Sequence, residues 1–209
     1  MAKVVGIGTG ISGKVGNVQY KTVKGMQIIQ TKSTPINRQS SSQFVNRTVF
    51  GQLNDLFKPL VFSIIKPFWN PSVIGKRSGW SVCLSENQKL QSGSVLDYSK
   101  IILTLGTLPS ETIIFFNYVP VSGTAIISWT SVGSEGSHPG DHLSVFIYDV
   151  STGNWYHPTT SETRGTAPAI VIIPKNLLKS NLRCYIFFRY LDPVSDKLIS
   201  HSNSTYKSG

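Results

Sequence analysis

The chain has 209 residues, 40% of them hydrophobic, which is enough to bury a core without disulfides or a bound metal. Its formal net charge of +10 is unevenly spread, because residues 1–66 hold nine basic side chains and one acidic one, whereas the remainder holds eleven and nine. The N-terminus lacks the apolar run of a secretory signal, and no stretch approaches the roughly 20 apolar residues that cross a bilayer. We therefore expect a protein with no membrane span that is made in the cytoplasm.

The glycine-rich N-terminal third is predicted to form an arm that contains a β-hairpin. Residues 15–23 and 26–32 alternate small or apolar residues with polar ones, and Lys24-Gly25 between them favours a turn. The glycine-spaced segment 6–13 is similar to a phosphate-binding loop, but a strand rather than a helix is predicted after it. Bends at glycines are therefore the better interpretation of this segment than a nucleotide site.

Basic residues of this region form a candidate surface for nucleic acid or for a protein partner. They are Lys3, Lys14, Lys21, Lys24, Lys32, Arg38 and Arg47. A basic segment attached to a nearly neutral body gains affinity for a polyanion by releasing its counterions, without recognising a base sequence. The alternative is a solvated basic surface that keeps the protein soluble.

One amphipathic helix is predicted to follow the arm. Ser40 and Gln43 form a capping box, and apolar residues recur at helical spacing over residues 44–64. Pro59 must kink or restart this helix, because proline has no backbone N–H and its ring clashes with the preceding turn. The apolar face must be covered either by the protein's own core or by a neighbouring subunit. A second short helix is predicted around residues 79–89.

From residue 96 onward the pattern changes to short strands separated by turn residues. We expect strands over residues 100–105, 112–119, 124–130, 143–150, 169–173, 183–190 and 198–201. The chain is therefore predicted to be mainly β, with an antiparallel immunoglobulin/fibronectin-like or jelly-roll-like sandwich over residues 96–209. Residues 1–95 are predicted to form a separate region that holds the basic arm, the β-hairpin and the helical segment.

Three residues of the apolar segments are predicted to be buried. Trp129 ends an apolar strand and is expected to be a core tryptophan. Cys83 and Cys184 lie far apart in the sequence, each within an apolar stretch, so they are expected to be reduced core cysteines.

Side chains suited to catalysis or metal binding are sparse. His138 and His142 form the densest histidine cluster and Asp149 follows, but the cluster spans a Pro-Gly turn and lacks a third imidazole or a thiolate. The ten acidic residues include no pair spaced to share a proton, and no serine lies in a Gly-x-Ser-x-Gly elbow. The sequence therefore predicts no enzyme, no metal site and no cofactor.

Trp155, Tyr156 and His157 follow a turn and are predicted to lie on a loop at one end of the sandwich. Exposed aromatic residues there can stack on sugars, on bases or on a neighbouring subunit, which makes these residues a candidate ligand or interface loop. The alternative is that Trp155 and Tyr156 cover the edge of the core. Arg183 and Arg189 flank aromatic residues on one strand, where they belong either to such a binding surface or merely to the solvent face of the strand.

Short motifs are distributed over nearly the whole chain. The most specific is Ser12-Gly13-Lys14-Val15-Gly16-Asn17, and others are Asp97-Tyr98-Ser99-Lys100, Gly106-Thr107-Leu108-Pro109, Ile127-Ser128-Trp129 and Ser200-His201-Ser202-Asn203-Ser204-Thr205-Tyr206. Together they resemble an uncharacterised domain family that is common in flavobacteria and their relatives. The chain departs from that family where Asn37-Arg38-Gln39-Ser40 replaces an Asn-Pro-Arg-Thr type of helix start. The family has no assigned function, so the resemblance implies a fold and a source but no catalytic residue.

Two functions fit these observations. The first is a non-enzymatic structural or assembly protein, namely a capsid, penton or spike subunit in the virion of a bacterial virus or prophage. Such a subunit would form a homo-oligomer or bind other virion proteins, and its basic arm would contact nucleic acid without sequence preference. The alternative is a cytoplasmic bacterial β-sandwich module that recognises a glycan or a protein through its end loops.

Overall fold

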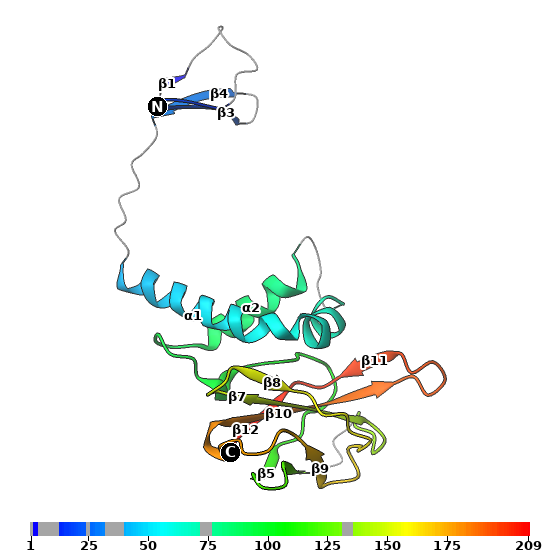
Figure 1. Cartoon of the computed structure of the whole chain (residues 1–209). Helices are drawn as coiled ribbons and strands as arrows, with labels where there is room; N and C mark the ends of the chain where they lie inside the picture. The colour runs from blue at the N-terminus through cyan, green and yellow to red at the C-terminus, as the bar shows by residue number, and fades with distance from the viewer. Residues whose placement is uncertain (1, 4–12, 24–25, 32–39, 72–76, 131–135) are drawn as a thin grey trace. The chain divides into compact units, whose positions relative to one another are not determined.

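The computed structural model describes residues 2–3, 13–23, 26–31, 40–71, 77–130 and 136–209. The chain divides into two compact units, Met1–Ser40 and Ser41–Gly209, which are drawn together in Figure 1. The division therefore falls at Ser40 rather than at residue 95, where the sequence analysis placed it. The reason is that the helical segment shares a hydrophobic core with the strands that follow it.

The first unit contains a small antiparallel sheet. Its strands are β1 (Ala2–Lys3), β2 (Gly13–Val15), β3 (Val18–Val23) and β4 (Met26–Thr31), in the order β1-β4-β3-β2. The register of β3 and β4 pairs Tyr20 with Ile29 and Lys21 with Ile28, which confirms the predicted β-hairpin. The Lys24-Gly25 turn and the glycine-spaced segment 6–12 lie outside the described residues.

The second unit begins with a helical layer. Helix α1 (Ser41–Phe57) continues into the 3₁₀ turn η1 (Lys58–Leu60) and the π-helical segment η2 (Val61–Trp69), and helix α2 (Gly79–Leu90) follows. The predicted break at Pro59 is confirmed, since the α-helix ends at Phe57 and restarts as a 3₁₀ turn. Helix α2 confirms the second predicted helix, and the Ser78 hydroxyl caps it by accepting the Ser81 N–H at 3.2 Å.

The remaining strands form two antiparallel sheets. The central sheet contains β7 (His142–Asp149), β8 (Asn154–Tyr156), β10 (Leu182–Leu191), β11 (Leu198–His201) and β12 (Thr205–Ser208), in the order β11-β10-β7-β8, with β12 also paired to β10. The outer sheet contains β5 (Ile113–Val119), β6 (Thr124–Trp129) and β9 (Ala169–Ile172), in the order β5-β6-β9. Two 3₁₀ turns, η3 (Tyr98–Lys100) and η4 (Lys179–Asn181), lie in the connections. The prediction of a mainly β chain is confirmed.

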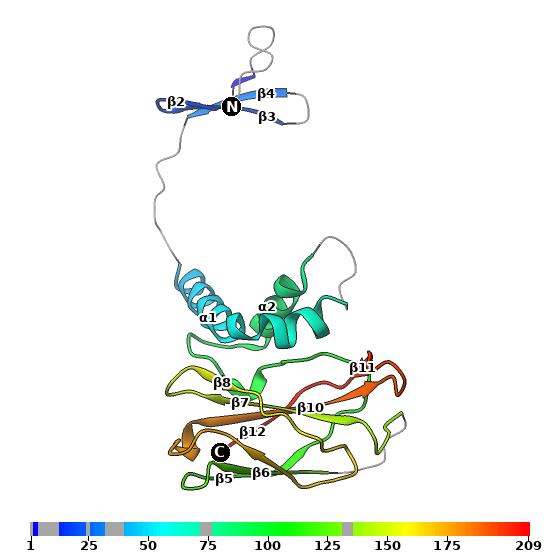
Figure 2. The same ribbon diagram turned by 45° about the vertical axis from the view of Figure 1, so that its right-hand side comes forward.

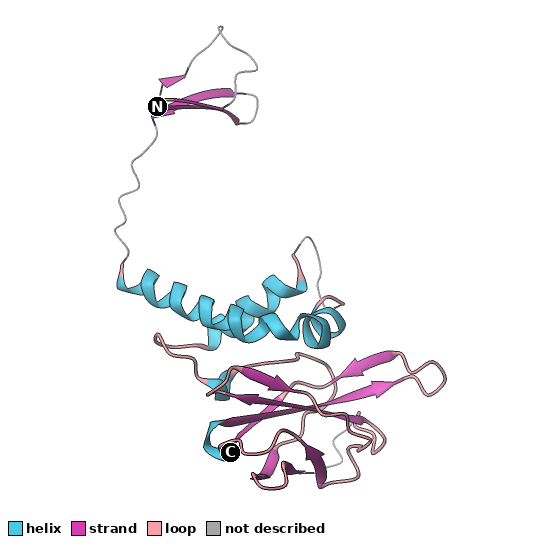
Figure 3. Cartoon of the chain, viewed as in Figure 1, coloured by secondary structure: helices cyan, strands magenta, loops and turns pink. Residues whose placement is uncertain are grey.

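The central sheet lies between the helical layer and the outer sheet (Figures 1 and 2). Figure 3 shows that the long helices of this unit, α1 and α2, lie on one side of the strands. In the part of the chain that the structure describes, no helix has the length and apolar character needed to cross a membrane.

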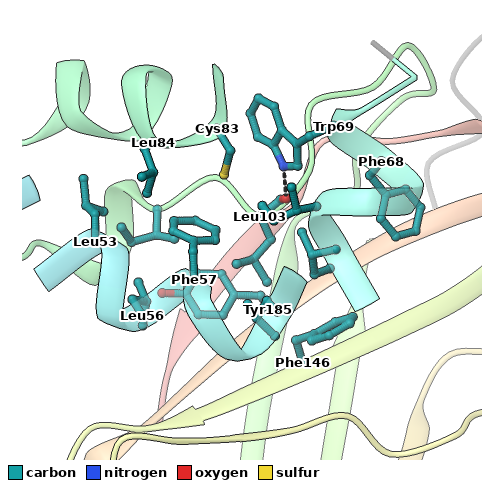
Figure 4. Close-up of a cluster of buried hydrophobic side chains, with 14 of the residues drawn as sticks. Leu53, Leu56, Phe57, Phe68, Trp69, Cys83, Leu84, Leu103, Phe146 and Tyr185 are labelled. Carbon is teal, nitrogen blue, oxygen red and sulfur yellow. Dashed lines mark hydrogen bonds between the residues drawn. The ribbon is translucent and has the colours of Figure 1, made fainter. Parts of the chain in front are cut away.

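Alternate residues of the central strands supply two different hydrophobic cores. The helix-side core contains Leu53, Phe57, Phe146, Tyr185 and Phe187, most of them visible in Figure 4. The outer core contains Trp129, Val145, Cys184, Ile186 and Phe188. A strand buried on both faces has no polar face, which explains the nearly continuous apolar run of β10.

Burial of the three predicted core residues is confirmed, and the apolar helix face is buried from Val49 to Ile64, whereas Phe44 at its start is exposed. Trp129 is buried in the outer core, where its indole Nε1 donates to the Arg164 carbonyl at 3.0 Å. Cys83 and Cys184 are both free thiols in buried positions. Burial raises the pKa of each thiol far above its ordinary value, so neither is a reactive thiolate.

Two segments that are about 100 residues apart in the sequence lie side by side in this unit. The Ser204 hydroxyl accepts the Leu103 N–H at 2.8 Å, and the Leu108 N–H donates to the His201 carbonyl at 3.0 Å. At Gly106 a Cβ would clash with that carbonyl, so only glycine fits the close approach. Two of the short motifs, residues 106–109 and residues 200–206, therefore contact each other.

The predicted strand over residues 100–105 is wrong, although this segment is extended. It forms no strand ladder, because the Ile102 N–H donates to Asn87 Oδ1 at 2.7 Å and the Thr104 carbonyl accepts a single backbone N–H, from Ser204 at 3.2 Å. Asn87 is itself fully buried and donates back to the Ile102 carbonyl at 3.0 Å. Strands β8 and β12, of three and four residues, were missed.

Candidate functional site

A pocket of about 200 Å³ lies between η2 and one end of the central sheet, and we call it the Arg189 pocket. Its lining residues are Ser63, Pro67, Phe68, Ser144, Phe146, His157, Phe187, Arg189, Leu191, Asp196 and Leu198. They come from the helical layer, from β7, β10 and β11, and from the two connections that follow β8 and β10. Aromatic rings dominate its walls, and a guanidinium and an imidazole supply its basic groups.

Strand alternation places Arg189 in this pocket. Tyr185 and Phe187 of β10 point toward the helices, so Arg189, two residues further on, points the same way. Its register partners are His142 on β7 and His201 on β11. Because residues directly opposite each other share one face of a sheet, three basic side chains form a row across three strands. His142 and His201 line adjacent pockets.

The Arg189 guanidinium has no acidic partner. The ion pairs of the described residues are formed by Lys89, Lys100 and Arg164, with N···O distances up to 3.4 Å, and none includes Arg189. Its Nε is buried and makes no hydrogen bond to any described residue. Burial lowers the pKa of Arg189, yet a guanidinium stays charged at neutral pH. The pocket therefore contains a partly dehydrated cation without a counterion.

His157 stacks on the aromatic wall of the pocket. Its ring lies 4.0 Å from the Phe146 ring, centroid to centroid, with an interplanar angle of 11°. Partial burial lowers the pKa of His157, and the positive charge of Arg189 lowers it further. The imidazole is therefore neutral at pH 7 and can either donate or accept a hydrogen bond.

Asp196 is the acidic residue of the pocket lining. It is exposed and lies in the β10–β11 connection, where its backbone has a φ of 51° and its N–H donates to the Asp192 carbonyl at 2.9 Å. With His157 neutral, Arg189 and Asp196 leave the lining without net charge. The more buried of these two charges is positive, because Arg189 is half-buried whereas Asp196 is exposed.

A second arginine, Arg164, lies on the opposite side of the central sheet and is fully paired. Its Nη1 donates to Glu111 at 2.6 Å, its Nε to Asp141 at 3.1 Å and its Nη2 to the Pro109 carbonyl at 2.9 Å. The side chains of Arg164, Glu111 and Asp141 are exposed by 3%, 3% and 0%. The guanidinium carbon lies 4.4 Å from the centre of the Phe188 ring. This cluster holds the outer core together and leaves no room at Arg164 for a ligand.

The predicted basic arm is distributed over both units. Lys3, Lys14 and Lys21 lie on strands of the first unit, whereas Arg47 is an exposed residue of α1 in the second. Lys24, Lys32 and Arg38 lie outside the described residues. The register of β2 and β3 pairs Lys14 with Gln19, whose neighbour two residues along the strand is Lys21. Lys14 and Lys21 therefore share one face of the small sheet.

The predicted aromatic loop is instead a strand, since Trp155 and Tyr156 belong to β8. Trp155 packs into the helix-side core, and its indole Nε1 donates to the Leu56 carbonyl at 2.9 Å. Tyr156 packs against the outer core. Both residues are half-buried and join β8 to its neighbours, as in the alternative interpretation. His157 alone of the three lines the Arg189 pocket.

Among the described residues, no group of three or more His, Cys, Asp or Glu side chains is arranged to hold a metal ion. His138 and His142 line a common pocket, but Asp149 lies at the other end of β7. The Asp149 carboxylate is occupied there by the hydroxyls of Ser151 and Thr152, at 2.7 and 2.9 Å.

Sequence reasoning missed Arg189 because it assigned the residue to a solvent face. The signal was present in the apolar run of residues 184–188, which lacks the alternation of apolar and polar residues that a half-exposed strand shows. Such a run predicts a strand covered on both faces. An arginine at its end must then lie under a covering layer.

Comparison of the chain with protein-family models, with curated proteins and with solved structures finds no match. The function must therefore be argued from the chain's own residues.

Proposed function

We propose that this protein is a non-enzymatic structural and assembly protein that forms homo-oligomers through the sheet of its first unit. The observation that carries the proposal is that this sheet forms a separate compact unit in which none of the described side chains is buried. An isolated small sheet is marginally stable in water unless its apolar face is covered. A second copy of the same sheet would provide that cover.

The two faces of this sheet differ in character. Val18, Tyr20 and Ile29 share one face, because Tyr20 pairs with Ile29 and Val18 lies two residues before Tyr20. The other face carries Lys14 and Lys21, a pair of glutamines of which Gln30 Nε2 donates to Gln19 at 3.4 Å, and Ile28, which pairs with Lys21. Packing of two apolar faces in an isologous dimer would leave the lysines in solvent, where they are free to contact a polyanion.

The virion of a bacterial virus or prophage is the setting that we propose for this assembly, with the protein as a capsid, penton or spike subunit made in the host cytoplasm. Support comes from the separate assembly unit and from the concentration of positive charge in residues 1–66. Membership of the flavobacterial family remains part of the proposal, and it rests on the motifs rather than on the comparisons.

We also propose that the two sheets of the second unit form an immunoglobulin- or fibronectin-like sandwich rather than a jelly roll. The support is the strand order, in which β5-β6-β9 faces β8-β7-β10-β11. Immunoglobulin-type domains place strands A, B and E on one sheet and strands C, F and G on the other. The chain order of the strands matches this arrangement, with β8 as an extra strand beside β7.

The alternative function, recognition of a glycan or protein through end loops, has less support. Trp155 and Tyr156 were its expected anchors, and both are engaged in packing within the unit. That alternative predicts a monomer in solution.

A matched pair of substitutions on one strand tests the assembly proposal. In the full-length protein, Ile29→Lys places a charge on the apolar face, whereas Gln30→Lys places the same charge on the opposite face. Light scattering after size exclusion should show an oligomer for the wild type and for Gln30→Lys, and a monomer for Ile29→Lys. A wild-type protein that stays monomeric at high concentration would refute the proposal and would favour coverage by the second unit or a monomeric binding module.

A further inference from the structure

The Arg189 pocket combines a cation without a counterion, aromatic walls and a small volume. None of these properties is used by the assembly function proposed above. Each one restricts the chemistry of a molecule that could fill the pocket.

Charge is the first restriction. A half-buried guanidinium whose Nε has lost water and gained no acceptor is stabilised by any anion that enters. The guanidinium presents N–H groups in a planar fork, which matches the two oxygens of a carboxylate. The exposed Asp196 carboxylate at the rim disfavours an anion of charge −2, because it would face like charge on entry.

Shape is the second restriction. The rings of Phe68, Phe146 and Phe187 line the pocket, and the Phe68 and Phe187 rings meet edge to face with centroids 5.0 Å apart. A cavity of about 150 Å³ lined by apolar side chains accommodates one benzene molecule. At about 200 Å³ the Arg189 pocket has room for one six-membered ring and a small substituent.

We propose that the Arg189 pocket binds a small monocarboxylate that carries an aromatic ring. The carboxylate pairs with Arg189, and the ring lies among Phe68, Phe146 and Phe187. The Ser144 and His157 side chains, which line the same pocket, are placed to hydrogen-bond a polar substituent of the ring or the second carboxylate oxygen.

The test uses the full-length protein with benzoate as the probe and benzamide as its neutral isostere, followed by ¹⁵N-resolved NMR titration and calorimetry. We expect saturable shifts of the amides of Ser63, Ser144 and Phe187 with benzoate, and benzamide binding at least about tenfold weaker. Equal affinity for the two probes, or no saturation by roughly 10 mM benzoate, would overturn the proposal.

A pair of arginine variants on one strand locates the site. Arg189→Gln should weaken benzoate binding about tenfold to a hundredfold, since it removes a charge-assisted hydrogen-bond pair. Arg183→Gln changes the same residue type on the same face of β10, six residues away, and should leave the affinity within about twofold. Thermal unfolding of both variants shows that they fold. Equal affinities of the two variants would overturn the proposal.

Two further probes separate the sources of the carboxylate. If inorganic phosphate binds more tightly than benzoate, the pocket is a general anion site and the monocarboxylate proposal is overturned. N-acetyl-phenylalanine mimics the C-terminus of a peptide, and a clearly higher affinity for it than for benzoate would overturn the small-molecule assignment in favour of a peptide. Because Ile29→Lys lies in the other unit, its oligomeric state can change while benzoate binding stays the same, so the two proposals fail independently.

Discussion

Arg164 and Arg189 show how the two faces of one sheet use the same side chain differently. Arg164 stacks on the Phe188 ring from the outer side and is held between Glu111 and Asp141. Arg189, the next residue on the strand after Phe188, points to the helix side and has no acidic partner. A buried arginine with two carboxylates is a structural element, whereas a half-buried arginine without one keeps its charge available to an anion from elsewhere.

The difference between the paired and the unpaired arginine should appear in the free energy of unfolding. Pairing offsets the cost of removing a charge from water, and an unpaired charge pays that cost in the folded state. Removal of Arg164 should therefore destabilise the fold, and removal of Arg189 should not. The following predictions run from the largest expected effect to the smallest.

Arg164→Met should lower the free energy of unfolding by about 3–5 kcal/mol, because it leaves the Glu111 and Asp141 carboxylates buried without a cation. Urea denaturation followed by tryptophan fluorescence measures the change. A loss below about 1 kcal/mol would show that Arg164 contributes no more to stability than an exposed ion pair does, and so does not differ from Arg189 in this respect.

Glu111→Gln should lower the free energy of unfolding by a smaller amount, about 1–3 kcal/mol. Arg164 keeps its bond to Asp141, and the glutamine keeps an oxygen near Nη1, so only the charge of one partner is lost. The same denaturation experiment applies. An effect larger than that of Arg164→Met would contradict the role of Arg164 as the centre of the cluster.

Arg189→Met should leave the free energy of unfolding unchanged or raise it by up to about 1 kcal/mol, since an apolar side chain replaces a cation that has no partner. Together with the expected loss of benzoate binding, a stable variant would identify Arg189 as a binding residue. Destabilisation comparable to that of Arg164→Met would instead assign it to packing.

Stability should decline slightly as the pH falls from about 6.5 toward 5. The folded-state pKa values of His157 and His201 are lowered, chiefly by burial, so the unfolded chain takes up protons first as the pH falls. Stability is then lost over the interval between the unfolded and the folded pKa. Arg189 and Asp196 are the charged groups that line the pocket with His157. Denaturation midpoints at several pH values should show a shallower slope for His157→Gln, and an unchanged slope would contradict the burial of this ring.

Most of the secondary structure could be predicted from local sequence. The start of the first helix at Ser41, the break at Pro59 and the β3–β4 hairpin follow from capping residues, proline geometry and two-residue alternation. Prediction failed for the segment that contains Ile102, because its hydrogen bonds go to side chains distant in the sequence. It also failed for Trp155, since a turn followed by aromatic residues does not reveal which layer will cover them.

Composition and periodicity by themselves determined that this chain is mainly β, that its positive charge is concentrated near the N-terminus and that its cysteines are buried. Only the tertiary structure decided which arginine is paired, because Glu111, Asp141 and Arg164 lie up to 53 residues apart and meet through folding alone. It also decided that Arg189 lines a pocket, since strand pairing and the helical layer together leave this side chain half-buried. Alternation along a strand shows that two faces exist, but what covers each face depends on the packing of distant segments.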